Sequence, residues 1–485
     1  MVPIGSPAEN WRARPVIYIE NRNRSLFHAA RMIEPPFQRW TWAEPKRIIM
    51  PARRHLAREA FPPPTNQRRS TDSASRPRKR THVCVIGLRA IPFMIGGVEA
   101  HCQKLYPEML RQDDGLRVTI LIRKSFSASE RFDFEGLQVK TIWSPKIWGV
   151  DTLVYSFLSI LYARLFVHPD LVHLHGIGPG FFTPLARLLG FRTIVTHHAQ
   201  DYLRPKWSSH ARRFLKLGER FSAYFANAVI CVSNALYADF LGLYPRARRR
   251  TCVIHNAAAV GDMGKPNTDP ILKELGLEPG RYILAVGRIE ATKGFDQAIA
   301  AFRLADRQDY KLVIVGSDLG DAIYAKELRQ QASDRVIFAG FQTGDALRRL
   351  YEEAALFVHP SHMEGYALVV AEALIADIPV ILSDITPHRE FGLPEHCYFK
   401  PGDIAWLAGM LATKDFGRYA APEASAAQQR NSWARSARHH LQLYYALLRR
   451  TFPSPPATAS SKSAQYSAAT SRNPKHSARR RASAS

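Results

Sequence analysis

The chain has 485 residues, of which 46% are apolar, 11% aromatic and 22% charged. This composition excludes a chain that is disordered throughout, a collagen-like chain and a single small module, and the length suffices for two or three domains. A formal charge of +25 would by itself suggest a nucleic-acid or anionic-membrane partner, but most of that charge lies at the two ends.

The two ends differ from the rest of the chain in composition. Residues 1–80 carry 17 basic and 6 acidic side chains with 11 prolines, and residues 451–485 carry 6 basic and no acidic ones. Residues 81–450, with 44 basic and 36 acidic side chains, are only about +8. We therefore expect a disordered basic Pro/Arg-rich extension over residues 1–80 and a disordered Ser/Ala/Arg tail over residues 451–485.

Cysteine usage and apolar runs predict the compartment. The five cysteines are odd in number, widely spaced and without a CxxC pair, which favours a reduced, cytosolic chain. The first thirty residues lack the continuous apolar run of a signal peptide. The most apolar stretch, Leu153–Val167, is 15 residues long and contains Arg164, which is short of the ~20 residues that span a bilayer. We interpret it as a buried or interfacial amphipathic helix.

From His82 onward, short β-branched runs alternate with longer helical patterns, as in parallel sheets buried on both faces. The first set of expected strands is His82–Gly87, Arg117–Ile122, Leu171–Leu174, Thr193–Thr196 and Ala228–Val232. Helices are expected near Val98–Leu110, Thr152–Phe166 and Ser209–Phe225.

After a pause at Gly261–Asp269 the alternation begins again. The second set of expected strands is Tyr282–Val286, Lys311–Val315, Val336–Phe338, Ala355–Val358 and Val380–Leu382, with helices starting near Phe295, Ala322, Asp345 and Gly365. The pattern predicts an α/β protein with two Rossmann-like doubly wound domains facing a central cleft, over residues 81–262 and 263–430. An amphipathic helix over residues 431–450 would pack across them as a brace.

Two glutamates, Glu364 and Glu372, stand eight apart in EGYALVVAE after an expected strand. If Gly365 opens a helix, Glu372 lies about two turns inside it, roughly 12 Å along the axis. The amide groups of the first turn would then face a bound phosphate or sugar. Taken alone, the pair is more simply explained by a capping Glu364 and a solvated Glu372.

Two further loops carry residues that suit a phosphate-containing ligand. Arg288 and Lys293 share one strand-to-helix loop, GRIEATKGFD, and two cations there suit a diphosphate. Gly96 and Gly97 follow the first strand and allow a ligand to approach the backbone, although a simple tight turn explains them as well. The spacing is not GxGxxG, so a dinucleotide cofactor is not indicated.

Histidines cluster at the ends of two expected strands, in LVHLHG and IVTHHAQD. No HExxH spacing or acidic triad accompanies them, so we expect no metal. A histidine at such a strand end can instead bind a sugar hydroxyl, whereas His173 alternates inward and is expected to pack in the core.

Seven segments occur in the order typical of one family: GGVEAH, HHAQDY, AVICVSNAL, VIHNAA, VGRIEATKG, EGYALVVAEA and SDI. Over about His82–Arg449 the chain resembles the retaining GT-B glycosyltransferases of family 4, the group 1 glycosyltransferases of bacterial polysaccharide synthesis. It departs from the family pattern in carrying Asp377 where a glycine is usual, and Ala367 at a position that is often small or glycine.

The resemblance implies a role for each matching residue. His198, with His197 as the fallback, and Glu364 would act at the transferred sugar. Glu372 would hold the ribose, and Arg288 and Lys293 would neutralise the donor diphosphate. The remaining donor-binding positions that it implies are Gly96, Gly97, Gly365, Tyr366, Ala367 and Leu368.

The reaction implied is transfer of a sugar, with retention at the anomeric carbon, from a nucleotide-diphosphate sugar to a lipid-linked or polysaccharide acceptor hydroxyl. It needs no metal or other cofactor, because cations and a helix N-terminus offset the leaving diphosphate. With no carboxylate obviously placed as a nucleophile, a front-face attack assisted by the leaving phosphate is favoured over double displacement.

The enzyme would be cytoplasmic and peripheral on the inner membrane face, with the anionic membrane surface as a further partner and no nucleic acid.

Two alternatives remain open at this point. A GT-B nucleotide-sugar epimerase would need acid–base carboxylates in the first domain, where only Glu99 and Asp201 are candidates. A non-enzymatic basic nucleic-acid-binding protein would use the charged ends, and would show a steep salt dependence that survives mutation of Glu364.

Overall fold

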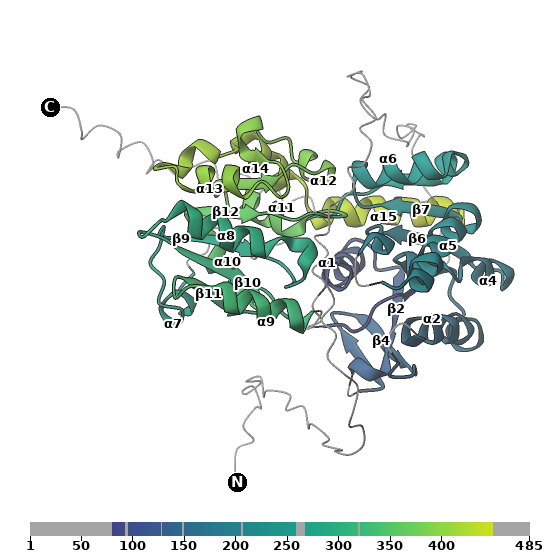
Figure 1. Cartoon of the computed structure of the whole chain (residues 1–485). Helices are drawn as coiled ribbons and strands as arrows, with labels where there is room; N and C mark the ends of the chain where they lie inside the picture. The colour runs from purple at the N-terminus through teal and green to yellow at the C-terminus, as the bar shows by residue number, and fades with distance from the viewer. Residues whose placement is uncertain are drawn as a thin grey trace, which may run out of the picture. The chain divides into compact units, whose positions relative to one another are not determined.

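The structure is a computed structural model. It describes residues 80–92, 96–127, 129–147, 150–204, 207–258, 267–318 and 321–449. These residues contain two parallel α/β sheets, one in each half of the sequence (Figure 1). The expected basic extension up to residue 79, the expected tail from residue 451 and most of the pause at Gly261–Asp269 lie outside the described residues. The domain boundary expected at 262/263 therefore stays a prediction.

The first sheet has eight strands in the order β3-β4-β2-β1-β5-β6-β7-β8, and every pair is parallel except β3 with β4. Its strands are β1 (Thr81–Ile86), β2 (Leu116–Arg123), β3 (Arg131–Phe134), β4 (Leu137–Ile142), β5 (Leu171–His175), β6 (Arg192–His197), β7 (Ala228–Cys231) and β8 (Thr251–Val253). All five predicted strands are present. The short, partly polar β3, β4 and β8 were not predicted.

Helices cover both faces of this sheet, which explains why the central strand β1 is apolar on both sides. Val83, Cys84, Val85 and Ile86 have no exposed surface, and alternate residues belong to different core clusters. The helices are α1 (Gly97–Gln112), α2 (Val150–Tyr162), α3 (Ile177–Gly180), α4 (Thr183–Leu188), α5 (Ser209–Phe225) and α6 (Asn234–Leu243).

The second sheet has six strands, all paired in parallel, in the order β11-β10-β9-β12-β13-β14. Its strands are β9 (Tyr282–Val286), β10 (Lys311–Val315), β11 (Val336–Gly340), β12 (Leu356–His359), β13 (Val380–Ser383) and β14 (Tyr398–Phe399). Its helices are α7 (Ile271–Glu274), α8 (Phe295–Ala305), α9 (Ala322–Gln331), α10 (Gly344–Glu352), α11 (Leu368–Ile375), α12 (Thr386–Arg389), α13 (Ile404–Leu411) and α14 (Pro422–Arg430).

The strand order reverses once in each sheet, between β1 and β5 and between β9 and β12. In doubly wound sheets, ligands bind beyond the carboxyl ends of the strands at this reversal. Gly96, Arg288 and Glu364 lie in the loops that follow β1, β9 and β12, and His175 is the last residue of β5. The topology therefore places the predicted motifs where such sheets bind ligands.

The helix expected to open at Gly365 begins three residues later, at Leu368. The residues after β12 are held to the neighbouring loop instead: the His362 amide donates to the Thr292 carbonyl at 2.8 Å, and so does the Ser361 hydroxyl at 3.0 Å. Glu372 is consequently only a little over one turn inside α11, not two. The helix ends at Ile375, and Asp377 follows with a φ of 55°, the left-handed conformation that explains the usual glycine and that aspartate tolerates.

The last helix, α15 (Trp433–Leu448), occupies almost the whole of the predicted amphipathic segment. It packs against α1 of the first half, and Ala437, Leu441 and Tyr444 lie in the same buried cluster as Val83 of β1 (Figure 1, yellow). Between the second sheet and this helix, α14 contacts α11. The end of the described chain thus returns to the first sheet after completing the second.

The apolar stretch Val150–Val167 forms α2 and a short π-helical continuation over Ala163–Val167. By length and composition it is the one described helix that could cross a membrane, and 28% of it is buried. It is also anchored in the first half, because the Tyr155 hydroxyl contacts the Leu121 carbonyl and Arg123 pairs with Asp151 at 2.5 Å. Phe157, Leu165 and Phe166 are exposed.

Candidate active site

The loop between β9 and α8 carries two cations, Arg288 and Lys293. Between them in sequence lies a carboxylate, Glu290, which was not among the predicted site residues. Lys293 ends a short 3-10 turn, and Gly294 follows it with a φ of 68°. A Cβ on Gly294 would lie 2.3 Å from the Pro360 carbonyl oxygen, so only glycine fits there. This close approach of the two loops brings Lys293 to the end of β12.

Glu364 is the partner of Lys293, as their Oε1 and Nζ atoms lie 2.6 Å apart and both side chains are largely buried. His359, the last residue of β12, also contacts Glu364 Oε1 through its Nε2, at 2.7 Å. Burial opposes ionisation of Glu364, but Lys293 and His359 hold the pKa of its carboxyl well below the ordinary value. An ionised carboxylate next to a buried ammonium can accept sugar hydroxyls while the ammonium faces a phosphate.

Arg288 lies on the same loop and contacts Glu290 at 3.2 Å. Arg204, in the loop after β6 of the first half, also pairs with Glu290. One of its guanidinium nitrogens lies 2.8 Å from the Glu290 carboxylate. Burial disfavours the charged form of Glu290, yet Arg204 and Arg288 lower the pKa of its carboxyl overall. Arg204 and Glu290 are thus site residues that sequence reasoning missed. The available signal was their position in loops that follow strands, inside the motifs HHAQDYLR and GRIEATKG.

The side chains of His197, which ends β6, and of His198, which follows it, lie in different surroundings. His197 is buried and its Nε2 contacts Glu219 at 2.7 Å, so this fallback residue belongs to the core of the first half. His198 is half-buried and its Nε2 lies 3.0 Å from His175 Nδ1. Burial, then the neighbouring His197, lowers the pKa of His198 to about 3, which leaves its ring neutral. Of the two, His198 is the one whose side chain contacts His175 at the end of β5.

His173 packs as predicted. It is fully buried, and its ring nitrogens contact the Tyr106, Tyr444 and Thr196 hydroxyls at 2.6–2.9 Å.

The double glycine at the start of α1 has two separate roles. A Cβ on Gly96 would lie 2.2 Å from Glu99 Oε2 and 2.6 Å from an Arg89 nitrogen, so this glycine makes room for the Arg89–Glu99 ion pair. A Cβ on Gly97 would meet no atom of the described residues within 4 Å, so none of these residues covers the backbone at this helix N-terminus. Gly97 has the environment expected of a ligand-binding position.

The segment after Glu364 offers fewer free backbone amides for a ligand than predicted. Gly365 is buried, and a Cβ there would lie 1.8 Å from the His198 carbonyl oxygen, which makes it a contact between the two halves. The Leu368 amide already donates to the Tyr366 carbonyl at 2.9 Å, so it is not a free donor in this structure. Ala367 is buried and caps α11, and the Tyr366 hydroxyl donates to Gln428 at 3.1 Å.

Glu372 faces a less polar environment than Glu364. Its Oε2 accepts a hydrogen bond from the Tyr351 hydroxyl at 3.0 Å, and burial raises the pKa of its carboxyl to about 7. Among the described residues no cation pairs with it, and such a carboxyl group is suited to neutral hydroxyl groups such as those of a ribose.

The two carboxylates that an epimerase would need in the first half are both engaged in ion pairs. Glu99 is paired with Arg89 at 2.9 Å, and Asp201 with Arg204 at 2.9 Å. Neither is therefore a free acid–base group in the described structure, which argues against that alternative.

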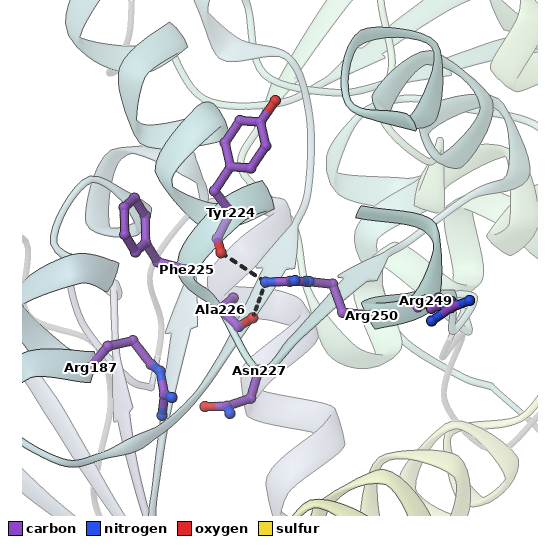
Figure 2. Close-up of a pocket in the computed structure, with 7 residues that line it drawn as sticks. All are labelled: Arg187, Tyr224, Phe225, Ala226, Asn227, Arg249 and Arg250. Atoms are coloured by element: carbon purple, nitrogen blue, oxygen red, sulfur yellow. Dashed lines mark hydrogen bonds between the residues drawn. The ribbon is translucent and has the colours of Figure 1, made fainter. Parts of the chain in front are cut away.

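A separate pocket of about 580 Å³ lies beside the amino ends of β6, β7 and β8, away from the strand ends that carry the motifs (Figure 2). It is lined by Arg187, Tyr224, Phe225, Ala226, Asn227, Arg249 and Arg250. Arg250 donates to the Tyr224 carbonyl at 2.7 Å, so part of this basic lining serves the backbone that precedes β7. None of the predicted site residues lies there.

Comparison with known proteins gives matches over both halves. The family model described as Glycosyltransferase Family 4 matches residues 95–260, and that described as Glycosyl transferases group 1 matches residues 268–408. An uncharacterised glycosyltransferase of Methanocaldococcus jannaschii is 29% identical over 388 residues, covering 73% of this chain and 95% of that protein. The GDP-mannose:cellobiosyl-diphosphopolyprenol alpha-mannosyltransferase of Xanthomonas oryzae pv. oryzae is 29% identical over 229 residues, 45% of this chain and 57% of that one.

Solved structures share the fold. Sucrose-phosphate synthase from Thermosynechococcus elongatus superposes with a TM-score of 0.64 at 20% identity, covering 76% of this chain and all of that one. Anabaena HepE in complex with UDP and glucose gives a TM-score of 0.61 at 20% identity with the same coverage. Since the two family models match in chain order and the two Rossmann-like halves are those of GT-B proteins, the chain belongs to the group 1 glycosyltransferases of the GT-B fold.

Proposed function

We propose that the protein transfers a hexosyl group from a nucleotide-diphosphate sugar to a hydroxyl of a lipid-linked or polysaccharide acceptor, with retention at the anomeric carbon. The observation that carries this proposal is the buried contact between Lys293 and Glu364, 2.6 Å long. It joins a cation suited to a diphosphate with a carboxylate suited to sugar hydroxyls, on loops 71 residues apart in sequence. A donor whose sugar and diphosphate are directly linked needs both groups side by side.

Each site residue has a defined task in this proposal. Arg288 and Lys293 offset the charge that develops on the leaving diphosphate, so that no metal is required for that step. Glu364 accepts hydroxyls of the transferred sugar, His198 contacts the same sugar, and Glu372 holds the ribose. Gly97 allows the donor phosphate and the acceptor to approach the first half.

Retention fits best with attack on the same face that the diphosphate leaves, with the leaving phosphate oxygen taking the acceptor proton. A double displacement would need a free carboxylate next to the anomeric carbon. In the described part of the site, Glu364 is held by Lys293 and His359, and Glu99 and Asp201 are held by arginines. These three carboxylates are thus engaged as binding or structural groups.

Two relatives support the substrate classes. The Xanthomonas protein is named for a GDP-mannose donor and a diphosphopolyprenol acceptor, and the Anabaena protein holds UDP and glucose. GDP-mannose is a donor of the class that we propose for this chain, and UDP is the nucleotide part of such a donor.

The donor experiment uses the full chain with UDP-, GDP- and dTDP-sugars, read by thermal shift and by slow donor hydrolysis. One nucleotide sugar should stabilise the wild type, and Lys293→Ala should abolish that shift, while Lys326→Ala, an exposed lysine on α9, should keep it. If a folded wild type responds to no nucleotide sugar, or if Lys293→Ala responds fully, the proposed donor site is wrong. With the donor known, NMR of the first-formed product tests retention.

We also propose that the enzyme is cytoplasmic and works on the inner face of the cell membrane, with the helix Val150–Val167 lying in the lipid interface. Leu165 and Phe166 are 63% and 66% exposed, and Lys146 and Arg164 stand close by in the sequence. Apolar side chains flanked by basic ones are typical of helices that lie on anionic lipid. In flotation with anionic liposomes, Leu165→Glu should reduce binding, while Leu304→Glu, equally exposed on α8, should not. A wild type that stays unbound at low salt would contradict this.

A further inference from the structure

Three histidines of the first half converge from separate elements: His101 on α1, His175 at the end of β5 and His198 after β6. One ring nitrogen from each lies within 4.8 Å of those of the other two. The ring centroid of His198 lies 5.0 Å from that of His101 and 5.3 Å from that of His175. Two nitrogens bound to one Zn²⁺ at about 2.1 Å lie at most about 4.2 Å apart, so small shifts of the side chains bring all three within reach of one ion.

The free nitrogen of His101 is identified by its hydrogen bond. His101 Nδ1 lies 2.7 Å from the amide oxygen of Asn256, an acceptor, so Nδ1 carries the proton. His101 Nε2 then carries the lone pair. That atom is buried and has no hydrogen-bond partner among the residues that the structure describes, and the side chain has no exposed surface. Buried ring nitrogens are normally partnered, so an unpartnered one next to two other imidazoles points to a ligand.

His175 is oriented in a comparable way. Its Nε2 lies 2.6 Å from the Tyr106 hydroxyl, and its Nδ1 faces His198 Nε2 at 3.0 Å. When Nε2 donates to the tyrosine oxygen, Nδ1 is left as an acceptor. Metal-bound histidines typically have their second nitrogen hydrogen-bonded in this manner, which fixes the tautomer and the ring orientation.

The chemistry of the group selects the class of ion. All three ligands are imidazoles, and the hydrogen bonds of His101 Nδ1 and His175 Nε2 leave the other ring nitrogen of each of these two residues to bind an ion. Neutral imidazoles without a carboxylate suit Zn²⁺ and other late first-row divalent ions, not Mg²⁺ or Ca²⁺.

The other histidine group with metal-like spacing, His359, Glu364 and His388, is less suited to a cation. Its carboxylate is already paired with the ammonium of Lys293 at 2.6 Å. That ammonium would repel a cation placed beside it.

We propose that His101, His175 and His198 bind a divalent transition metal such as Zn²⁺, with His198, the half-buried member, on the accessible side. The ion replaces the hydrogen bond between His175 and His198 and gives His101 Nε2 a partner. It is not needed for the transfer reaction. Because it occupies His198 Nε2, we expect it to inhibit transfer, and this last step rests on the proposed function.

The test uses full-length protein treated with a chelator and titrated with Co²⁺, whose visible d–d bands report coordination by the protein. The wild type should bind one Co²⁺ with these bands, and Zn²⁺ should displace it. His198→Gln, at a half-buried loop position, and His101→Gln should lose the bands, while His210→Gln, an exposed histidine on α5, should retain them. Asn256→Ala should weaken binding about 10- to 100-fold, as expected for loss of a supporting hydrogen bond. Circular dichroism of each variant checks that it is folded.

A wild type without visible bands, or bands that persist in both folded ligand variants, would overturn the metal site. Neither result depends on catalysis, so failure of the metal site and failure of the proposed transferase function are distinguishable. With the donor identified, Zn²⁺ should slow transfer by the wild type and a chelator should restore it. An unchanged rate at saturating Zn²⁺ would remove the inhibitory role.

Discussion

Replacing Glu372 with glutamine removes a carboxyl group whose ionisation is less favourable in the folded chain than in the unfolded chain. Burial raises the pKa of the Glu372 carboxyl to about 7 from its ordinary value of 4.5, even though the Tyr351 hydroxyl donates to it at 3.0 Å. In the unfolded chain the same carboxyl titrates near 4.5. Between these two pH values the folded protein holds a proton that the unfolded chain has released, so the free energy of unfolding falls as the pH rises.

The size of this effect follows from the interval between the two pKa values. Each pH unit within it lowers the free energy of unfolding by about 1.4 kcal/mol, which gives about 3 kcal/mol between pH 4.5 and pH 7 and no further loss above that. Glu372→Gln can still accept the Tyr351 hydrogen bond but does not ionise. The variant should therefore gain about 2 to 3 kcal/mol relative to the wild type on going from pH 5 to pH 8.

Urea unfolding followed by tryptophan fluorescence at pH 5 and pH 8 measures this difference. Glu327→Gln, which changes an exposed carboxyl on α9, serves as the control and should show no such trend. If the difference between Glu372→Gln and the wild type changes by less than about 0.5 kcal/mol over this range, the carboxyl is not buried as described and the reasoning fails.

Two contacts between the halves of the chain give further predictions. Gly365→Ala would place a Cβ 1.8 Å from the His198 carbonyl oxygen, so we expect a loss of about 1 to 3 kcal/mol in unfolding free energy and at least a tenfold loss in transfer rate. Gly409→Ala, whose Cβ would meet no atom of the described part of the chain within 4 Å, is the control, and equal behaviour of the two would refute the close contact. Arg204→Gln leaves the buried Glu290 with one arginine fewer, and urea unfolding should show a loss of about 1 to 3 kcal/mol; a variant as stable as the wild type would contradict the ion pair.

The sequence alone determined the fold class and most of the elements. Runs such as Tyr282–Val286 and Lys311–Val315 are strands with the predicted bounds, because a parallel strand buried on both faces must be apolar throughout. The family motifs identified the chain as a group 1 glycosyltransferase, and the loops after the strands contained Arg288, Lys293 and Glu364. These inferences succeeded because they depend on local periodicity and on the order of motifs, both of which are written along the chain.

Tertiary structure alone decided which neighbours those residues have. The start of α11 was predicted three residues too early, because the segment between β12 and α11 contacts loops that are distant in sequence, through Ser361 and His362 at Thr292 and through Gly365 at His198. The separation of His197 from His198 depends on Glu219, and the pairing of Arg204 with Glu290 joins the two halves of the chain. Contacts of this kind arise from the order of strands in the two sheets, and pairing between distant segments leaves no periodic signal in the sequence.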